Sequence, residues 1–127
     1  MDKYVPIQTV LGTLKGRDCI YLDDAAFQNG VNQFVLKGEI NGNLCSKKRT
    51  GIDIPYEIIF FGVMALKMVE LDSCDSDSES SFDEVIGSSW IKSLGGKVDT
   101  NHHHYYFQTY DEVFEVVCDR YKFIVKQ

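Results

Sequence analysis

The sequence predicts an α+β domain built mainly from an antiparallel β-sheet of six to eight strands, with one or two short helices. Several segments alternate apolar and polar residues with a period of two, which is typical of strands that bury one face. Glycines and Asp or Asn residues separate these segments, and there is no regular strand–helix alternation of the kind that predicts parallel units. The chain has 127 residues, which is close to the commonest domain size, so residues 1–127 are predicted to form a single domain.

The first third of the chain predicts two strands and a hairpin. Residues 19–22 form a short strand-like run that ends at Asp23-Asp24, and residues 33–40 alternate in the manner of a half-buried strand. The pair Asn41-Gly42 follows directly. Because both residues tolerate a positive φ, the pair predicts a tight hairpin whose return strand begins at residues 43–45.

A second alternating run, residues 52–60, predicts a long central strand. Pro55 has no N–H to donate, so this part of the strand is expected at a sheet edge. From residue 59 onward both faces are apolar, which predicts that the strand enters the interior of a sheet and that Gly62 marks a bulge. Residues 63–71 fit a strand or a short helix equally well.

Residues 82–94 fit a helix, with a strand followed by a shorter helix as the alternative. Ser81 and Glu84 have the spacing of a capping box. Apolar residues then recur every four positions, at Phe82, Ile86, Trp90 and Leu94. Gly87 and the serines after it weaken the helix, and they leave open a strand over residues 82–86.

The last quarter of the chain predicts β-structure again. Residues 103–110 are rich in aromatic side chains, and residues 113–118 alternate with Cys118 on the apolar face. Asp119-Arg120 is expected to turn the chain into a strand over residues 121–125. These last two strands are predicted to form a terminal hairpin.

Charge and apolar content limit the classes of partner and the location. The formal net charge of −6 disfavours nucleic acid, whose binding depends on neutralising phosphates, and is compatible with a basic protein partner. The longest apolar stretch, residues 58–66, is shorter than the roughly 20 residues of a membrane span. The N-terminal residues do not have the pattern of a secretory signal, so a cytoplasmic location with reduced thiols is expected. No membrane association and no cofactor are expected, and the oligomeric state is not predicted.

An acidic and serine-rich stretch, residues 72–84, is predicted to be a loop within the domain. It fails as a calcium loop, because Ser80 and Ile86 stand where an EF-hand requires Gly and Glu. One interpretation is a solvated loop without a specific role. The other is a docking surface for a basic protein, formed by Asp75, Asp77, Glu79 and Asp83.

A second candidate site centres on the histidines. On a strand, His102 and His104 point the same way, so they could bind one metal ion together with Asp99 or Cys118. Cys118 and a histidine could also form a nucleophile–base pair oriented by Asp111 or Glu115. The simpler interpretation is a core thiol and a strand start with one partly buried histidine, and it is favoured because no second cluster has metal-ligand spacing.

The C-terminal segments resemble a group of known proteins. The residues concerned are Ser88-Ser89-Trp90-Ile91, His104-Tyr105-Tyr106-Phe107, and the run from Tyr110 to Val117. Over roughly the last 40 residues, the chain is similar to small uncharacterised bacterial proteins, some of which resemble immunity proteins encoded beside polymorphic toxins. The resemblance implies a β-rich bacterial cytoplasmic domain that binds a partner, and it implies no catalytic residues.

The leading hypothesis is therefore a non-enzymatic protein-binding domain of the immunity type. Its four loop carboxylates would cover the basic cleft of a toxin, and electrostatic steering would speed association. The alternative is a small enzyme or metal-binding domain centred on His102, His104 and Cys118. A third hypothesis is a structural subunit that dimerises through an exposed apolar face.

Overall fold

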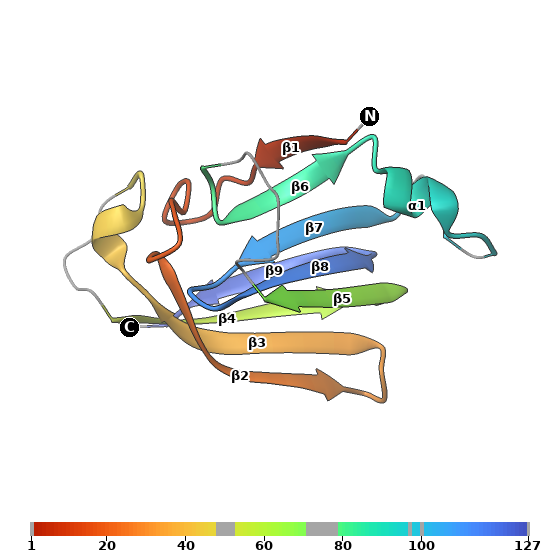
Figure 1. Cartoon of the computed structure of the whole chain (residues 1–127). Helices are drawn as coiled ribbons and strands as arrows, with labels where there is room; N and C mark the ends of the chain where they lie inside the picture. Colours follow the sequence, from red (N-terminus) through yellow and green to blue (C-terminus); the bar gives the residue numbers. More distant parts are fainter. Residues whose placement is uncertain (1, 48–52, 71–78, 97, 100, 127) are drawn as a thin grey trace.

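The computed structural model describes residues 2–47, 53–70, 79–96, 98–99 and 101–126. Within these residues, nine strands form two antiparallel sheets that pack face to face (Figure 1). The strand order of the five-stranded sheet is β1 (Lys3–Pro6), β6 (Phe82–Ile86), β7 (His103–Gln108), β8 (Glu112–Cys118) and β5 (Ala65–Glu70). The order of the four-stranded sheet is β2 (Ile20–Gln28), β3 (Gln33–Ile40), β4 (Ile54–Phe61) and β9 (Arg120–Val125).

The mainly antiparallel architecture is confirmed, but the strand number exceeds the predicted six to eight. The described part of the chain contains one α-helix, α1 (Ser89–Ser93), and one 3₁₀ turn, η1 (Gly42–Leu44). In the same residues there is no helix long and apolar enough to cross a membrane.

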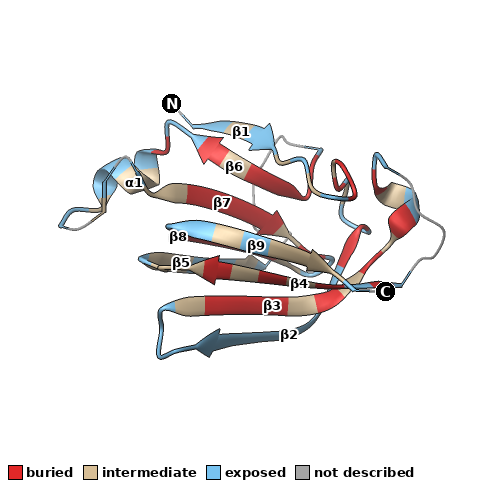
Figure 2. Ribbon diagram, turned by 180° about the vertical axis from the view of Figure 1, so that it is seen from behind, coloured by how far each residue is buried: buried red, intermediate tan, exposed pale blue. Residues whose placement is uncertain are grey.

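The core lies between the two sheets and is rich in aromatic rings. The rings of Phe34 and Phe114 meet across the interface at 5.7 Å, and those of Phe82 and Tyr121 meet edge to face at 5.1 Å. Figure 2 shows buried stretches along β3, β6 and β7, whereas most of β2 is exposed. Edge-to-face and offset ring pairs are favourable beyond the apolar area that they bury, so this aromatic layer holds the sheets together.

The predicted hairpin at Asn41-Gly42 is wrong, although the strand before it is correct. Asn41 has φ −80°, and its side chain accepts a hydrogen bond from Asn43 N at 3.0 Å, which caps the 3₁₀ turn. The partner strand of β3 begins only at Ile54, which lies opposite Ile40. Asn and Gly therefore form a local cap here rather than a two-residue turn.

The predicted edge position of Pro55 is also wrong. β4 lies inside its sheet, between β3 and β9. Pro55 is the second residue of β4, and its carbonyl accepts from Lys126 N at 2.8 Å, beyond the last residue of β9. The missing donor therefore falls at the end of a ladder, where a proline is tolerated.

Gly62 and the pair Asp23-Asp24 have different roles in the strands from those predicted. Gly62 has φ +65° and turns the chain between β4 and β5, so it is not a bulge within a strand. The register shift typical of a β-bulge lies between Leu22 and Asp24, and β2 continues through it to Gln28. The strand that was predicted to end at Asp23-Asp24 is thus more than twice as long as expected.

The alternative for residues 82–94 is confirmed: a strand, β6, precedes a short helix, α1. Ser81 does not cap a helix, because its hydroxyl donates to the carbonyl of Gly16. The helix cap is Ser88, whose Oγ accepts from Ile91 N at 3.1 Å.

The predicted terminal hairpin is wrong because β8 and β9 belong to different sheets. β8 pairs with β7 and β5, whereas β9 pairs with β4. Asp119 N donates to Phe61 O at 2.9 Å where the chain crosses from one sheet to the other. The alternation of residues 113–125 was recognised correctly, but it does not determine which strands pair.

Candidate functional site

The four carboxylates of the predicted acidic surface do not share one environment. Asp75 and Asp77 lie outside the described residues. Glu79 is exposed, and Asp83 lies in β6 with no exposed surface. The predicted loop therefore ends before Phe82. Asp83 is buried, so its carboxylate cannot be part of a docking surface.

The geometry does not support a site made from His104 and Cys118. His103 lies opposite Cys118 across β7 and β8, and His104 lies opposite Val117. Because successive side chains of a strand point to opposite faces, the imidazole of His104 and the thiol of Cys118 lie on opposite faces of the sheet. The thiol donates to Arg120 O, and burial raises the pKa of Cys118 to about 12, so it is not a nucleophilic thiolate.

The other proposed partners are also separated. Asp111 precedes β8, at the opposite end of the strands from the pair His103–Cys118. Asp99 does contact His102, with its backbone N–H donating to Nδ1 at 3.1 Å. No group of three potential metal ligands occurs among the described residues. A metal centre at His102, His104 and Cys118 is thus not formed.

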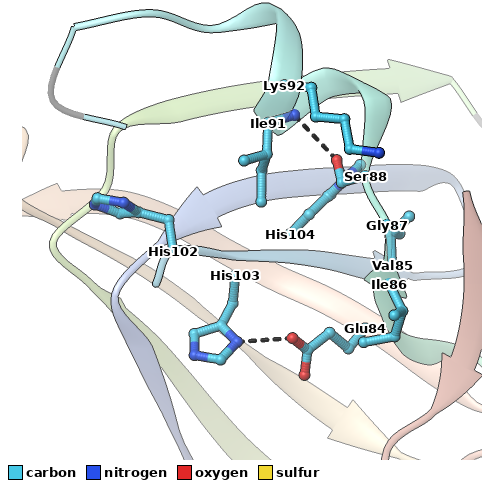
Figure 3. A pocket seen from close by; sticks show the side chains of 10 residues that line it. All are labelled: Glu84, Val85, Ile86, Gly87, Ser88, Ile91, Lys92, His102, His103 and His104. Carbon is cyan, nitrogen blue, oxygen red and sulfur yellow. Dashed lines mark hydrogen bonds and ion pairs between the residues drawn. The ribbon is translucent and has the colours of Figure 1, made fainter. Parts of the chain in front are cut away.

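The three histidines do line a pocket, at the point where β6 and β7 separate. Register pairing between these strands extends only to Glu84 and Tyr105, although both strands continue. Gly87, with φ +68°, then turns the chain into α1. The resulting cavity has a volume of about 260 Å³. Figure 3 shows its lining, which we call the histidine pocket: Glu84, Val85, Ile86, Gly87, Ser88, Ile91, Lys92, His102, His103 and His104.

One wall of the histidine pocket carries a histidine–carboxylate pair. His103 Nδ1 and Glu84 Oε2 are 2.7 Å apart (Figure 3), and both side chains are partly exposed. The His103 ring also stacks on Tyr105, at 5.5 Å between centroids and 18° between planes. The carboxylate and the ring contact together fix the orientation of this imidazole.

Ser88 and His104 of the lining also belong to a buried serine–histidine–glutamate triad, which Glu115 completes from outside the pocket. Ser88 Oγ lies 2.7 Å from His104 Nδ1, and His104 Nε2 lies 2.7 Å from Glu115 Oε1. Lys67 is 3.5 Å from the second carboxylate oxygen, and its ammonium group lies 4.7 Å from the ring centre of Trp90. Trp90 in turn meets the His104 ring edge to face at 5.2 Å.

The two contacts of the triad are compatible with proton transfer from Ser88 to His104 when the ring carries its proton on Nε2. A neutral His104 that donates its Nε2 proton to the Glu115 carboxylate has a free lone pair on Nδ1, which can accept the Ser88 hydroxyl proton. Burial acts to raise the pKa of Glu115, but the hydrogen bond from His104 and the charge of Lys67 outweigh this and hold the pKa below its ordinary value. Glu115 is thus ionised beside His104 at neutral pH.

A second concave region lies on the outer side of the four-stranded sheet near the start of β2. This region, which we call the acidic depression, has a volume of about 420 Å³ and is lined by Tyr21, Asp23, Glu39, Asn41 and Asp53. Its described lining residues include three carboxylates and no Lys or Arg.

An exposed aromatic pair adjoins the acidic depression. Tyr21 and Tyr110 stack at 5.4 Å with 22° between their planes, and they are 40% and 39% exposed. The guanidinium of Arg17 lies 5.0 Å from the ring centre of Tyr110, and its Nε donates to the Tyr110 carbonyl at 2.9 Å. Strand β2 supplies Tyr21, and the β7–β8 connection supplies Tyr110.

Neither the acidic depression nor the place of Ser88 in a site follows from the sequence pattern. Asp23 stands at a predicted strand end, and Glu39 and Asp53 belong to two other segments, so no spacing in the sequence links the three carboxylates. The pairing of Tyr21 with Glu39 between β2 and β3 and the pairing of Ile40 with Ile54 between β3 and β4 bring these three residues together. For Ser88, the sequence does carry a signal: Gly87 followed by Ser88 fits a turn between a strand and the N-cap of a helix.

Comparison with protein-family models, with curated proteins and with solved structures found no match.

Proposed function

We propose that this chain is a protein-binding domain that takes a basic segment of a partner protein at the acidic depression. The observation that carries the proposal is the convergence of Asp23, Glu39 and Asp53 on one concave region beside an exposed tyrosine stack. Three carboxylates among the described lining residues create a negative potential that attracts Lys and Arg side chains.

The tyrosine stack supports a protein partner rather than a lone cation. Tyrosine is enriched at protein interfaces because it combines a large apolar ring with a polar hydroxyl. The Tyr21–Tyr110 pair is already oriented by stacking and by Arg17, so its side chains would lose little conformational freedom on binding. An aliphatic stem of a lysine or arginine could lie on the rings while its charge reaches the carboxylates.

The net charge of −6 extends the attraction beyond the depression. A field of this sign speeds association with a basic partner and weakens as salt increases. The more specific form of the proposal, which the C-terminal resemblance suggests, is an immunity-type protein that covers the basic cleft of a toxin. In that form the partner surface would be the part of the toxin that binds its own anionic substrate.

Two triple variants with the same charge test where the partner binds. Asp23→Asn/Glu39→Gln/Asp53→Asn neutralises the depression. Asp75→Asn/Asp77→Asn/Glu79→Gln neutralises the predicted loop carboxylates other than Asp83, which is buried. Each changes the formal net charge from −6 to −3. The partner would first be captured from an extract of the native host on the immobilised full chain, and its affinity for the three proteins measured at several NaCl concentrations.

We expect the depression variant to lose affinity by at least about tenfold at low salt, with a shallower salt dependence. We expect the loop variant to bind like the unmodified chain. Loss of binding in the loop variant alone would move the docking surface to the acidic stretch. Unchanged binding in both variants would contradict an electrostatic protein-binding role.

A further inference from the structure

The serine–histidine–glutamate triad borders the histidine pocket, and the protein-binding proposal makes no use of it. Ser88 and His104 both line this pocket, while Glu115 lies behind His104. Ser88 is only 5% exposed, and it is one of the residues that line the pocket. Two contacts of 2.7 Å connect the hydroxyl, the imidazole and an ionised carboxylate in sequence.

We infer that Ser88, His104 and Glu115 form a nucleophilic triad that hydrolyses small carboxylic esters entering the histidine pocket. A serine hydroxyl is a weak nucleophile until an adjacent base removes its proton, and a base works best when a third group fixes its ring orientation. His104 is placed as that base and Glu115 as the positioning group. The order of the three groups is what defines such a triad, whatever the fold that carries it.

The local fold explains how a serine comes to occupy this position. Strand β6 ends at Ile86, Gly87 turns the chain with φ +68°, and α1 begins at Ser89. Ser88 Oγ accepts from Ile91 N at 3.1 Å and lies 2.7 Å from His104 Nδ1, so two contacts fix the position of the hydroxyl oxygen. The cap of α1 therefore also orients the proposed nucleophile.

The pocket determines the class of substrate. Its volume of about 260 Å³ is near the lower limit for small-molecule sites, and Val85, Ile86 and Ile91 supply apolar side chains to it. Lys92 also lines the pocket, and an ammonium group there can stabilise negative charge that develops on a carbonyl oxygen. A short acyl chain on a neutral ester suits this combination.

Ester hydrolysis would proceed in two steps, acylation of Ser88 and hydrolysis of the acyl group. Ser88 Oγ attacks the carbonyl carbon while its proton passes to His104 Nδ1; the carbon–oxygen bond to the alcohol then breaks, and His104 returns the proton to the leaving oxygen. Water next attacks the acyl group on Ser88 and gives one proton to His104. That proton returns to Ser88 Oγ as the carboxylic acid leaves.

The test uses p-nitrophenyl acetate as substrate and a fluorophosphonate as covalent probe, with the full chain. We expect the unmodified protein to exceed Ser88→Ala in hydrolysis by at least about 100-fold, which is the lower end of the contribution of general acid–base catalysis. We also expect mass spectrometry to locate the phosphonyl group on Ser88. The matched control Ser89→Ala alters the neighbouring exposed serine, and it should retain the rate.

Two results would overturn the inference: hydrolysis no faster than that of Ser88→Ala, or a probe attached elsewhere or nowhere. The labelling experiment needs no variant, so it decides the question even where Ser88→Ala fails to fold. Glu115→Gln separates positioning from stability, since we expect kcat to fall at least about tenfold with KM nearly unchanged. Equal kcat values would exclude Glu115 from the triad.

Discussion

At Gly38 the backbone of β2 approaches β3 so closely that there is no room for a side chain. A Cβ at this position would lie 1.9 Å from the carbonyl oxygen of Tyr21 and 2.9 Å from its carbonyl carbon. Gly38 lies opposite Leu22, at the edge of the register shift in β2. The bulge therefore brings the backbone of β2 against β3 at a point where only glycine leaves room.

We predict that Gly38→Ala destabilises the protein by about 1–3 kcal/mol or more, because the clash is with backbone that cannot rotate away. Gly95→Ala is the matched control, since a Cβ there meets nothing within 4 Å. It should change the free energy of unfolding by no more than about 0.5 kcal/mol. Urea denaturation of both variants measures the difference, and equal stability of the two would show that β2 does not approach β3 as described.

Glu115 gives a pH dependence whose sign follows from its surroundings. Its pKa in the folded protein lies below the ordinary value of 4.5, because the His104 hydrogen bond and the Lys67 charge outweigh the effect of burial. A lowered folded-state pKa contributes stability above about pH 4.5 that is lost as the pH falls through the folded-state value.

We therefore predict that the unmodified protein loses unfolding free energy more steeply below pH 4.5 than Glu115→Gln does. Urea denaturation at a series of pH values between neutrality and the acid range gives the two curves. Glu79→Gln, with the same charge change at an exposed position, serves as control and should follow the unmodified protein. A steeper acid loss in Glu115→Gln than in the unmodified protein would contradict the assigned hydrogen bonds.

Strand β6 contributes a side chain that contacts both sheets. Phe82 is fully buried, and its ring contacts Phe107 in its own sheet and Tyr121 and Phe123 in the other. Residues 82–94 have apolar residues at helical spacing, but Phe82 lies in a strand, β6, and is a central residue of the core.

Phe82→Ala should lower the free energy of unfolding by about 3–5 kcal/mol, since it removes a buried ring and leaves a cavity between the sheets. Phe27→Ala is the comparison, because Phe27 lies on the edge strand β2 and is 45% exposed. Its cost should be about 1 kcal/mol or less. Thermal or chemical denaturation would contradict the assigned core if the two substitutions cost the same.

Local patterns predicted the elements better than they predicted the pairings. The alternation of Gln33–Ile40 gave β3 with its correct ends, because one face of that strand is buried against the other sheet. The same alternation in residues 113–125 could not show that β8 and β9 separate into different sheets. Strand pairing depends on contacts between segments far apart in the chain, such as β4 with β9, and no period within either segment encodes them.

The candidate sites were predictable to an even smaller extent. The histidine run indicates the correct region, and Glu115 contacts a histidine, His104, as one of the two orienting residues expected for it. The nucleophile expected beside that histidine, Cys118, lies instead on the other face of the sheet. Ser88 enters the triad only because β6 ends where it does. The acidic depression unites residues from β2, β3 and the approach to β4, and this depends on a register that the sequence leaves open.

At the scale of the whole molecule, the two sites lie in separate parts of the sandwich. The histidine pocket is built where β6 and β7 of the five-stranded sheet separate, and the acidic depression is built from β2, β3 and the residue before β4 in the other sheet. A substitution in one should leave the other intact, since effects of distant sites are usually independent. Binding and ester hydrolysis can therefore be tested separately on one protein.

The most direct test of the protein-binding proposal is a titration of the ¹⁵N-labelled chain with a lysine decapeptide at low salt, followed by amide chemical shifts. We predict that the largest shifts cluster at Tyr21, Asp23, Glu39, Asn41 and Tyr110, and that added NaCl reverses them. Shifts confined to residues 75–79 or to the histidine pocket, or no saturable shifts at all, would contradict the proposal that the acidic depression receives a basic partner.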